Sequence, residues 1–247
     1  MFLTEGLTTS SVGLLLAFSF AMGLRHALEP DHLAAVSTIV SDRKSIWSSS
    51  LVGGLWGIGH TIALLIAGVA VVFFHFEIGG TLASVLELGV GIMLLGLGAQ
   101  TLWKVVKGGR VHTHVHVHGG VLHAHPHVHD KVEVHAHQEP SKTHHGVKLS
   151  PKPLLVGLVH GLAGSGALML LILATIPTPS VAIAYILIFG MGSIGGMMAM
   201  SMLIGLPFHF AAGRFVSLDK WLRSAAGLFS LAFGMIWVIS LLPELFW

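Results

Sequence analysis

The chain has 247 residues, of which 53% are hydrophobic and only 10% are charged, and its mean hydropathy is +0.83. This composition is typical of a helical protein that crosses a membrane several times, and it excludes an ordinary soluble domain of the same length. The absence of cysteine excludes a disulfide framework, a thiolate metal site and a cysteine nucleophile. The first ten residues contain Glu5 and no Lys or Arg, so we expect no cleavable signal peptide.

Six apolar segments are long enough to cross about 30 Å of hydrocarbon as helices. They lie at roughly 10–41, 48–74, 80–106, 153–176, 180–207 and 221–243. No ten-residue alternation of apolar and polar residues recurs, which disfavours membrane strands. The sequence therefore predicts an all-α integral membrane protein with three parts. These are a first three-span repeat (1–106), a histidine-rich loop (107–152) and a second three-span repeat (153–247).

The first segment contains a dense polar cluster and is too long for one straight crossing. Ionisable side chains are costly inside a bilayer, so such a cluster indicates a functional site. Its polar members are Arg25, His26, Glu29, Asp31 and His32. Pro30 removes a backbone hydrogen bond and disfavours helix at the residue before it, so we predict a broken helix with its interruption at 27–31, near the midplane. Irregular backbone at that depth has to line a cavity or be buried in protein.

The distribution of basic residues predicts the orientation. If there are six spans, the connections 42–47, 104–152 and 208–220 lie on one side, and with their flanks they hold 12 of the 13 Lys and Arg residues. The positive-inside rule then places the long loop in the cytoplasm and both termini outside. We therefore expect a multi-pass protein of the inner (cytoplasmic) membrane.

The long loop holds 12 of the 18 histidines, between 111 and 145, mostly alternating with Val or Ala. Neutral imidazole is a good ligand for Ni, Cu, Co and Zn ions. A flexible array of this density would chelate such ions, although a plain linker of low complexity is the alternative. The loop indicates a transition metal without selecting which one.

The two halves of the sequence are related by glycine motifs at a nearly constant offset. Gly23-Leu-Arg-His26 matches Gly157-Leu-Val-His160 at an offset of 134, and Gly57-Ile-Gly-His60 matches Gly190-Met-Gly-Ser193 at 133. Three spans in each half would make the halves inverted repeats, an architecture found in many secondary transporters.

Six histidines lie outside the loop, and two of them, His75 and His209, fall at predicted span ends. His26 and His32 with Glu29 or Asp31 offer the nitrogen and oxygen ligands that suit Ni²⁺, Co²⁺ or Zn²⁺. His60 and His160 lie within spans at matching repeat motifs, as further ligands or as partners of ligands. The alternative is a polar kink in which Arg25 pairs with one of the acids.

The run His26-Ala-Leu-Glu-Pro-Asp-His32 has the form H-x4-D-H and resembles the signature of the nickel/cobalt permease family. The stretch 57–65, GIGHTIALL, is similar to the second histidine motif of that family. The stretches 157–168 and 201–208 more closely resemble its shorter branch of urease-accessory nickel permeases. In the family the first motif lies in an early transmembrane helix and binds the metal. The classical motif has Asp and Ala where this chain has Glu29 and Pro30, and classical members have eight spans.

From these features we expect a secondary transporter that takes up Ni²⁺, and also Co²⁺, through a site of His26, Glu29, Asp31, His32, His60 and His160. No nucleotide-binding motif and no organic cofactor are expected. The expected partners are the divalent ion, the lipid bilayer and a cytoplasmic metallochaperone or urease or hydrogenase maturation factor, with no nucleic acid. Three alternatives stay open: efflux through the same site, an intramembrane hydrolase, and a metal receptor that stores ions on the loop.

Overall fold

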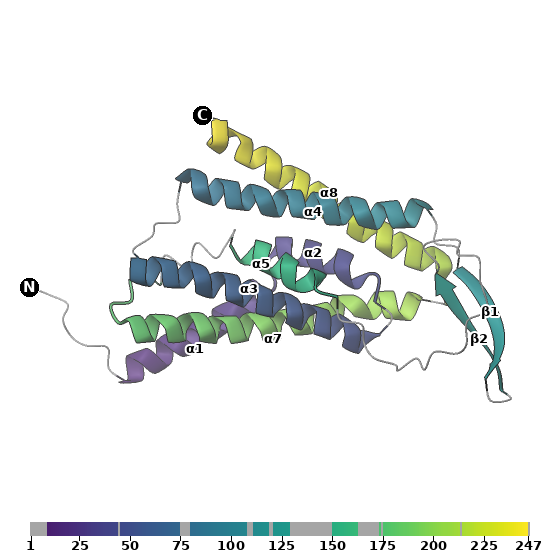
Figure 1. Ribbon diagram of the computed structural model, residues 1–247, viewed down its shortest axis with the longest axis horizontal. Coiled ribbons are helices and arrows are strands. Elements are labelled where there is room, and N and C mark those ends of the chain that lie inside the picture. Colours follow the sequence, from purple (N-terminus) through teal and green to yellow (C-terminus); the bar gives the residue numbers. More distant parts are fainter. Residues whose placement is uncertain are drawn as a thin grey trace, which may run out of the picture.

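The structure is a computed structural model that describes residues 9–43, 45–74, 80–107, 111–118, 121–128, 150–162, 173, 175–212 and 214–246. Its helices and strands are α1 (Thr9–His26), α2 (Pro30–Val40), α3 (Ile46–Phe74), α4 (Gly80–Lys107), β1 (Val111–His118), β2 (Val121–Val128), α5 (Lys152–Gly161), α7 (Pro179–Ala211) and α8 (Val216–Phe246). The helices run roughly along one common direction, and the two strands lie at one end of the bundle (Figure 1).

The membrane-spanning elements agree with the all-α membrane class predicted from the sequence. Among the described residues, α3, α4, α7 and α8 are each long and apolar enough to cross a bilayer. Helices α1 and α2 meet the same criterion together, as a pair bent by 54° that forms either a broken span or a re-entrant loop. The predicted fourth span, 153–176, is described only in part, as α5, Leu173 and the residues from 175 onward. The described helices therefore account for four or five crossings, and six crossings stay a prediction.

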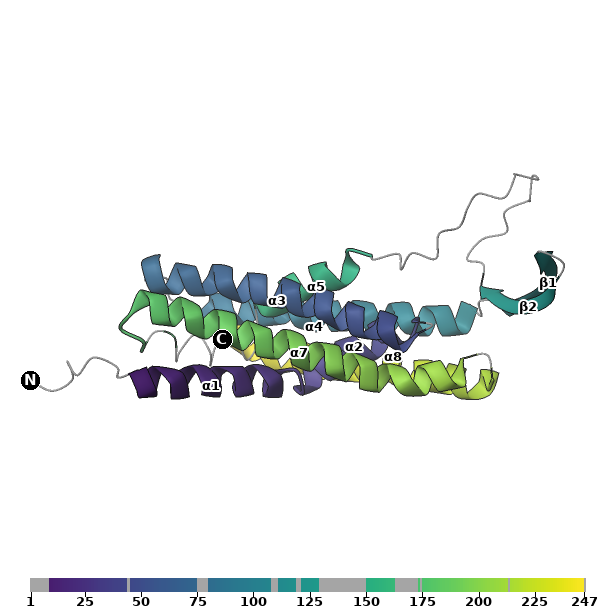
Figure 2. The ribbon, with the colours of Figure 1, turned by 90° about the horizontal axis from the view of Figure 1, so that it is seen from below.

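The helices form two layers, a first layer of four helices and a second layer of two, and α2 lies between them. Helices α1, α7, α3 and α5 lie side by side in that order, because α7 contacts both α1 and α3, and α3 contacts α5 (Figure 2). Helices α4 and α8 pair with each other on the other side. Helix α2 contacts α8, α7 and α4, so the second half of the broken helix lies between the layers. At the break itself Ala27 is buried, whereas Leu28 is 52% exposed.

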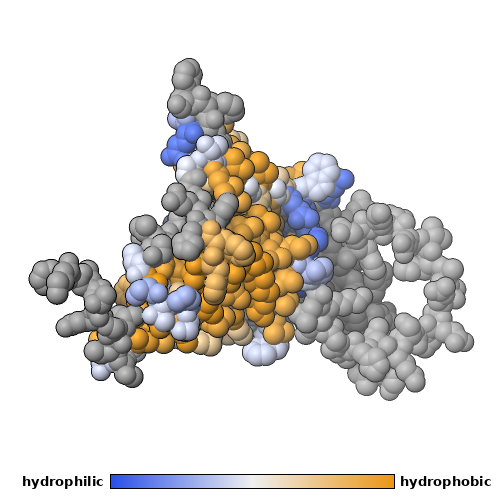
Figure 3. Space-filling view, turned by 60° about the vertical axis from the view of Figure 1, so that its left-hand side comes forward, coloured by the Kyte–Doolittle hydropathy of each residue, from blue (hydrophilic) through white to orange (hydrophobic). Residues whose placement is uncertain are grey.

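Large apolar side chains cover the outside of the bundle. Leu14, Ile66 and Ile236 are each more than 60% exposed. In Figure 3 the face toward the viewer is a continuous hydrophobic surface, with hydrophilic residues at its margins. Patches of this size on a folded chain mark a surface that meets another apolar phase, and the length of the helices matches a lipid bilayer.

Glycines bring the helices of the first layer into backbone contact. A Cβ at Gly23 of α1 would overlap the carbonyl oxygen of Phe189 in α7, and a Cβ at Gly157 of α5 would overlap the carbonyl oxygen of Trp56 in α3. The two contacts join residues related by offsets of 134 and 133 in the sequence. Helices α4 and α8 approach each other with the same reciprocity, Gly98 against Gly227 and Gly234 against Gly91. Small residues of this kind are what allows close helix approach in lipid.

Part of the histidine-rich loop forms a two-stranded hairpin, which the sequence pattern did not predict. Strands β1 and β2 pair antiparallel, and the register sets three histidines of one strand opposite three of the other: His112 with His127, His114 with His125, and His116 with His123. The rest of the loop lies outside the described residues.

Ion pairs join the end of the broken helix to the α4–α8 pair. Asp42, just after α2, bonds Lys104 of α4 and Arg223 of α8, the latter at 2.7 Å. These groups are partly exposed, so the pairs contribute little stability individually. They are at the ends of α2 and α4 and at the start of α8, the same end of the bundle as the hairpin (Figure 1).

Candidate metal centre

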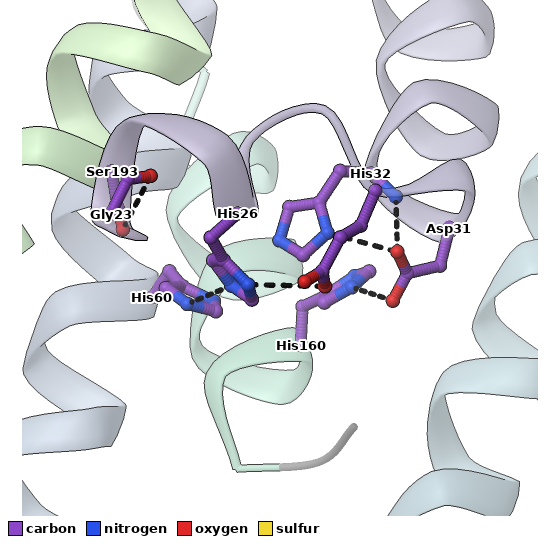
Figure 4. Close-up of polar contacts among 8 residues, drawn as sticks. Gly23, His26, Asp31, His32, His60, His160 and Ser193 are labelled. Carbon is purple, nitrogen blue, oxygen red and sulfur yellow. Dashed lines mark hydrogen bonds and ion pairs between the residues drawn. The ribbon is translucent and has the colours of Figure 1, made fainter. Parts of the chain in front are cut away.

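Five polar side chains from four helices meet in the middle of the bundle, and none of these residues is more than 4% exposed. They are His26 at the end of α1, Asp31 and His32 in the first turn of α2, His60 at the middle of α3 and His160 near the end of α5. Figure 4 shows the four imidazole rings and the carboxylate of Asp31 turned toward one another. We call these five residues the histidine cluster.

The break between α1 and α2 positions three members of the histidine cluster. Helix α1 ends at His26, Pro30 is the first residue of α2, and Glu29 between them is extended, with φ −66° and ψ 145°. The break at 27–29 falls within the predicted interval, and its cause is local, because proline fixes its own φ and disfavours helix at the preceding residue. The two helices are bent by 54° at the break, and across it the ring centroids of His26 and His32 lie 4.4 Å apart.

The carboxylate of Asp31 orients two imidazole rings. Its Oδ1 lies 3.0 Å from His32 Nδ1 and 2.9 Å from the backbone nitrogen of His32, and its Oδ2 lies 2.9 Å from His160 Nε2. An ionised carboxylate only accepts hydrogen bonds, so each ring donates from the nitrogen that faces Asp31. In the neutral rings the opposite nitrogens, His32 Nε2 and His160 Nδ1, then carry lone pairs. A carboxylate that fixes ring tautomer in this way is typical of histidine metal ligands.

His26 joins Glu29 and His60 in a second chain of contacts. His26 Nδ1 lies 3.1 Å from Glu29 Oε2, and His26 Nε2 lies 2.9 Å from His60 Nε2. The first contact assigns the proton of His26 to Nδ1, so His60 donates from Nε2 and its Nδ1 carries the lone pair. Glu29 is 34% exposed at its side chain, which makes it the only carboxylate beside the cluster that is also open to the surroundings among the described residues.

Buried nitrogens without a hydrogen-bond partner are concentrated here. Among the described residues, they include His32 Nε2, His60 Nδ1 and His160 Nδ1, together with the indole nitrogen of Trp56 next to them. Leaving a buried polar atom unbonded costs about 1–3 kcal/mol, so several such atoms in one place need an explanation. Imidazole nitrogens of this kind are ligand atoms that suit a divalent transition metal ion.

Two aromatic side chains enclose the cluster. Trp56 stacks on His32, with ring centroids 5.3 Å apart and an interplanar angle of 20°, and meets His160 edge-on at 5.6 Å. Phe189 lies 5.4 Å from His26. Sequence reasoning missed both residues, although they stand at the repeat offset of 133, one position before the paired Gly57 and Gly190.

Two overlapping sets of ligand atoms could each hold an ion. One consists of His26, His32 and His60, and the other of Asp31, His32 and His160. Within each set the ligand atoms lie within 4.8 Å of one another. His32 belongs to both.

The structure brings together all six residues that the sequence singled out, with Glu29 at the edge. The polar-kink alternative fails for Asp31, because this acid is held by His32 and His160 while Arg25 is exposed. His209 lies in the last turn of α7, away from the cluster, as predicted for a span-end residue. His75 lies outside the described residues. Ser193, the repeat counterpart of His60, donates to the carbonyl oxygen of Gly23 at 3.3 Å.

The fold is that of a multi-pass helical membrane protein, and a buried polar cluster beside a helix break is typical of membrane transporters. No protein-family profile matches the chain, and no solved structure matches it. Among characterised sequences, it is 36% identical over 228 residues to urease accessory protein UreH of Bacillus sp. (strain TB-90), covering 92% of this chain and 91% of that protein. The chain therefore belongs to the UreH family.

Two more distant relatives are also similar. A high-affinity nickel transport protein of Cupriavidus necator is 29% identical over 110 residues, which cover 37% of this chain and 31% of that protein. The chloroplast protein FOR GROWTH AND FERTILITY 2 of Arabidopsis thaliana is 24% identical over 242 residues, which cover 96% of this chain and 58% of that protein. The resemblance to nickel/cobalt permeases, nearest their urease-accessory branch, is confirmed, and the hydrolase alternative is wrong.

Proposed function

We propose that the protein imports Ni²⁺ across the cytoplasmic membrane and that the histidine cluster is the site through which the ion passes. The observation that carries this proposal is a buried cluster of four imidazole rings and one carboxylate in which three ring nitrogens have no hydrogen-bond partner. A nickel transport protein among the relatives supports the choice of ion. Imidazole and carboxylate ligands suit Co²⁺ as well, so Co²⁺ is a second substrate in this proposal.

The residues of the proposed site have different roles. The ring nitrogens of His26, His32, His60 and His160 replace water around the ion, and Asp31 balances part of its charge. Glu29, which is partly exposed and contacts His26, is the first carboxylate that an entering ion meets. No organic cofactor is needed, because the reaction moves an ion without changing it.

The proposed architecture is a pair of inverted three-span repeats, with α1/α2, α3 and α4 in one half and the span that begins with α5, α7 and α8 in the other. The reciprocal contacts support it, since Gly23 meets α7 as Gly157 meets α3. Movement of one half against the other around a central site would then give alternating access.

The proposed orientation places the histidine-rich loop in the cytoplasm and both termini outside. The positive-inside rule supports it, because the basic residues Lys104, Lys107 and Lys152 flank the loop. The start of α1 and the end of α8 lie toward one side of the bundle and the hairpin toward the other (Figure 1). On the cytoplasmic side, the loop would receive the ion and pass it to a metallochaperone or to urease or hydrogenase maturation factors.

Uptake of radioactive nickel by cells expressing equal amounts of wild type, His26→Ala and His32→Ala tests the proposal. We expect wild-type cells to accumulate the ion and both variants to fall to the level of cells without the protein, because each substitution removes a ligand from the buried site. Accumulation below that of empty cells, restored by the substitutions, would show that the same site works in efflux. Equal accumulation in all four strains would refute nickel transport.

Removal of the histidine-rich loop is expected to leave transport intact. We expect a chain lacking 111–145 to import nickel at saturating concentration at a rate within about twofold of wild type, and to differ in how the rate depends on metal concentration, because the loop chelates ions outside the membrane site. The initial uptake rate measured over a range of Ni²⁺ concentrations checks this. Complete loss of transport in a correctly inserted deletion variant would contradict it.

A further inference from the structure

We propose that the histidine cluster holds the transported ion at two alternative stations in turn, and that His32 is the ligand common to both. The His60 station consists of His26, His32 and His60, and the His160 station consists of Asp31, His32 and His160. This inference rests on the proposed function and adds a path for the ion within the site.

The spacing of the rings divides the cluster into two groups. The ring of His32 lies 5.4 Å from that of His60 and 4.2 Å from that of His160, whereas the rings of His60 and His160 are 6.2 Å apart. Metal–nitrogen bonds of about 2.0–2.1 Å require ligand atoms within about 4 Å of one another. Within each group the ligand atoms already lie within 4.8 Å of one another, which is close to that spacing.

The bonding of His32 allows only one ion at a time. Its Nδ1 is held by Asp31 at 3.0 Å, so Nε2 is the nitrogen left for a metal, and Nε2 is buried without a hydrogen-bond partner. Trp56 stacks on the ring and keeps it in place. A neutral imidazole ring carries one nitrogen lone pair, so His32 binds one ion at a time and the two stations are alternatives.

The two stations differ in charge and in the helices that carry their ligands. The His60 station has three imidazoles, while the His160 station includes the carboxylate of Asp31. His26 is the last residue of α1, and His160 is the next-to-last residue of α5. Both therefore lie at helix C-termini, whose partial negative charge favours a cation. These two helices belong to different halves of the sequence, so movement between the halves would favour one station over the other.

The test uses purified full-length protein in detergent, with Ni²⁺ as the only added ligand, and the variants His60→Asn, His160→Asn and His32→Asn. Each variant is also made in a chain that lacks 111–145, because the loop itself would bind Ni²⁺. In that background we expect His60→Asn and His160→Asn each to bind one Ni²⁺ per chain with a Kd within about tenfold of the otherwise unsubstituted chain, because one station remains in each. X-ray absorption at the nickel edge should show two imidazoles with a carboxylate in His60→Asn and three imidazoles in His160→Asn. His32→Asn should weaken binding by more than about 100-fold, because it removes the shared ligand.

His209→Asn, at the end of α7, is the matched control and should bind nickel as wild type does. If either asparagine variant lost its monodisperse elution or its wild-type melting temperature, the glutamine variant at the same position would replace it. Loss of more than about 100-fold in affinity in both His60→Asn and His160→Asn would indicate one undivided site and overturn the two stations. Two ions bound per wild-type chain at these residues would also overturn them. If cells with the wild-type protein take up nickel while either of these binding results is found, the two stations are wrong and the proposed function stands. Failure of the proposed function would instead appear as no nickel uptake by the wild-type protein.

Discussion

Asp31→Asn is expected to lower the initial rate of nickel uptake by about 100-fold or more while leaving the protein folded and inserted. Asparagine has nearly the same shape as aspartate but no charge, so the ion would lose its buried counter-charge. Removal of one member of a buried charged pair is strongly unfavourable, because the remaining charge stays desolvated. The side-chain amide of asparagine has one oxygen that accepts hydrogen bonds and one nitrogen that only donates them. It therefore could not accept hydrogen bonds from both His32 and His160, which Asp31 now orients.

The matched control is Glu87→Gln, because Glu87 is a carboxylate within α4 that belongs to neither group of candidate ligands. Its uptake rate should stay within about twofold of wild type. Equal amounts of each protein in the membrane fraction have to be verified first. An Asp31→Asn variant that transports nickel at the wild-type rate would show that the carboxylate is dispensable, and the proposed site would then be wrong.

Gly157→Ala is expected to destabilise the protein strongly, although it adds only one methyl group. The new Cβ would overlap the carbonyl oxygen of Trp56 and lie 2.9 Å from the backbone nitrogen of His60. Overpacking against rigid backbone costs about 1–3 kcal/mol, and at this position it would also push apart the two helices that carry His60 and His160. Thermal unfolding of the purified protein in detergent should show a melting temperature at least about 5 °C lower.

Gly96→Ala in α4 is the control, because a Cβ at Gly96 would meet no atom within 4 Å. It makes the same chemical change inside a helix and should leave the melting temperature unchanged. Gly23→Ala in α1 should have an effect similar to that of Gly157→Ala, since its Cβ would overlap the carbonyl oxygen of Phe189 in the matching contact. A wild-type melting temperature in Gly157→Ala would mean that α3 and α5 do not pack as described.

The sequence determined the features that depend on local chemistry. The apolar composition predicted membrane helices, because about 20 apolar residues form a helix of the bilayer's thickness. Pro30 predicted the break, since proline constrains its own backbone and that of the residue before it. The contact between His26 and Glu29 follows from their separation of about one helical turn. The loop was a different case, because alternating His and Val left open whether it would pair with itself.

Only the tertiary structure decided which distant side chains meet. His160 bonds Asp31 across 129 positions in the sequence, and His26 meets His60 across 34. The repeat motifs matched His160 to His26 and Ser193 to His60. They did not indicate that Asp31 bonds His160 or that Trp56 stacks on His32. Such contacts depend on which helices approach closely, and this is set by glycines whose packing partners lie far away in the chain. Local sequence therefore fixed where the helix breaks, while helix packing in three dimensions decided which ligands surround the break.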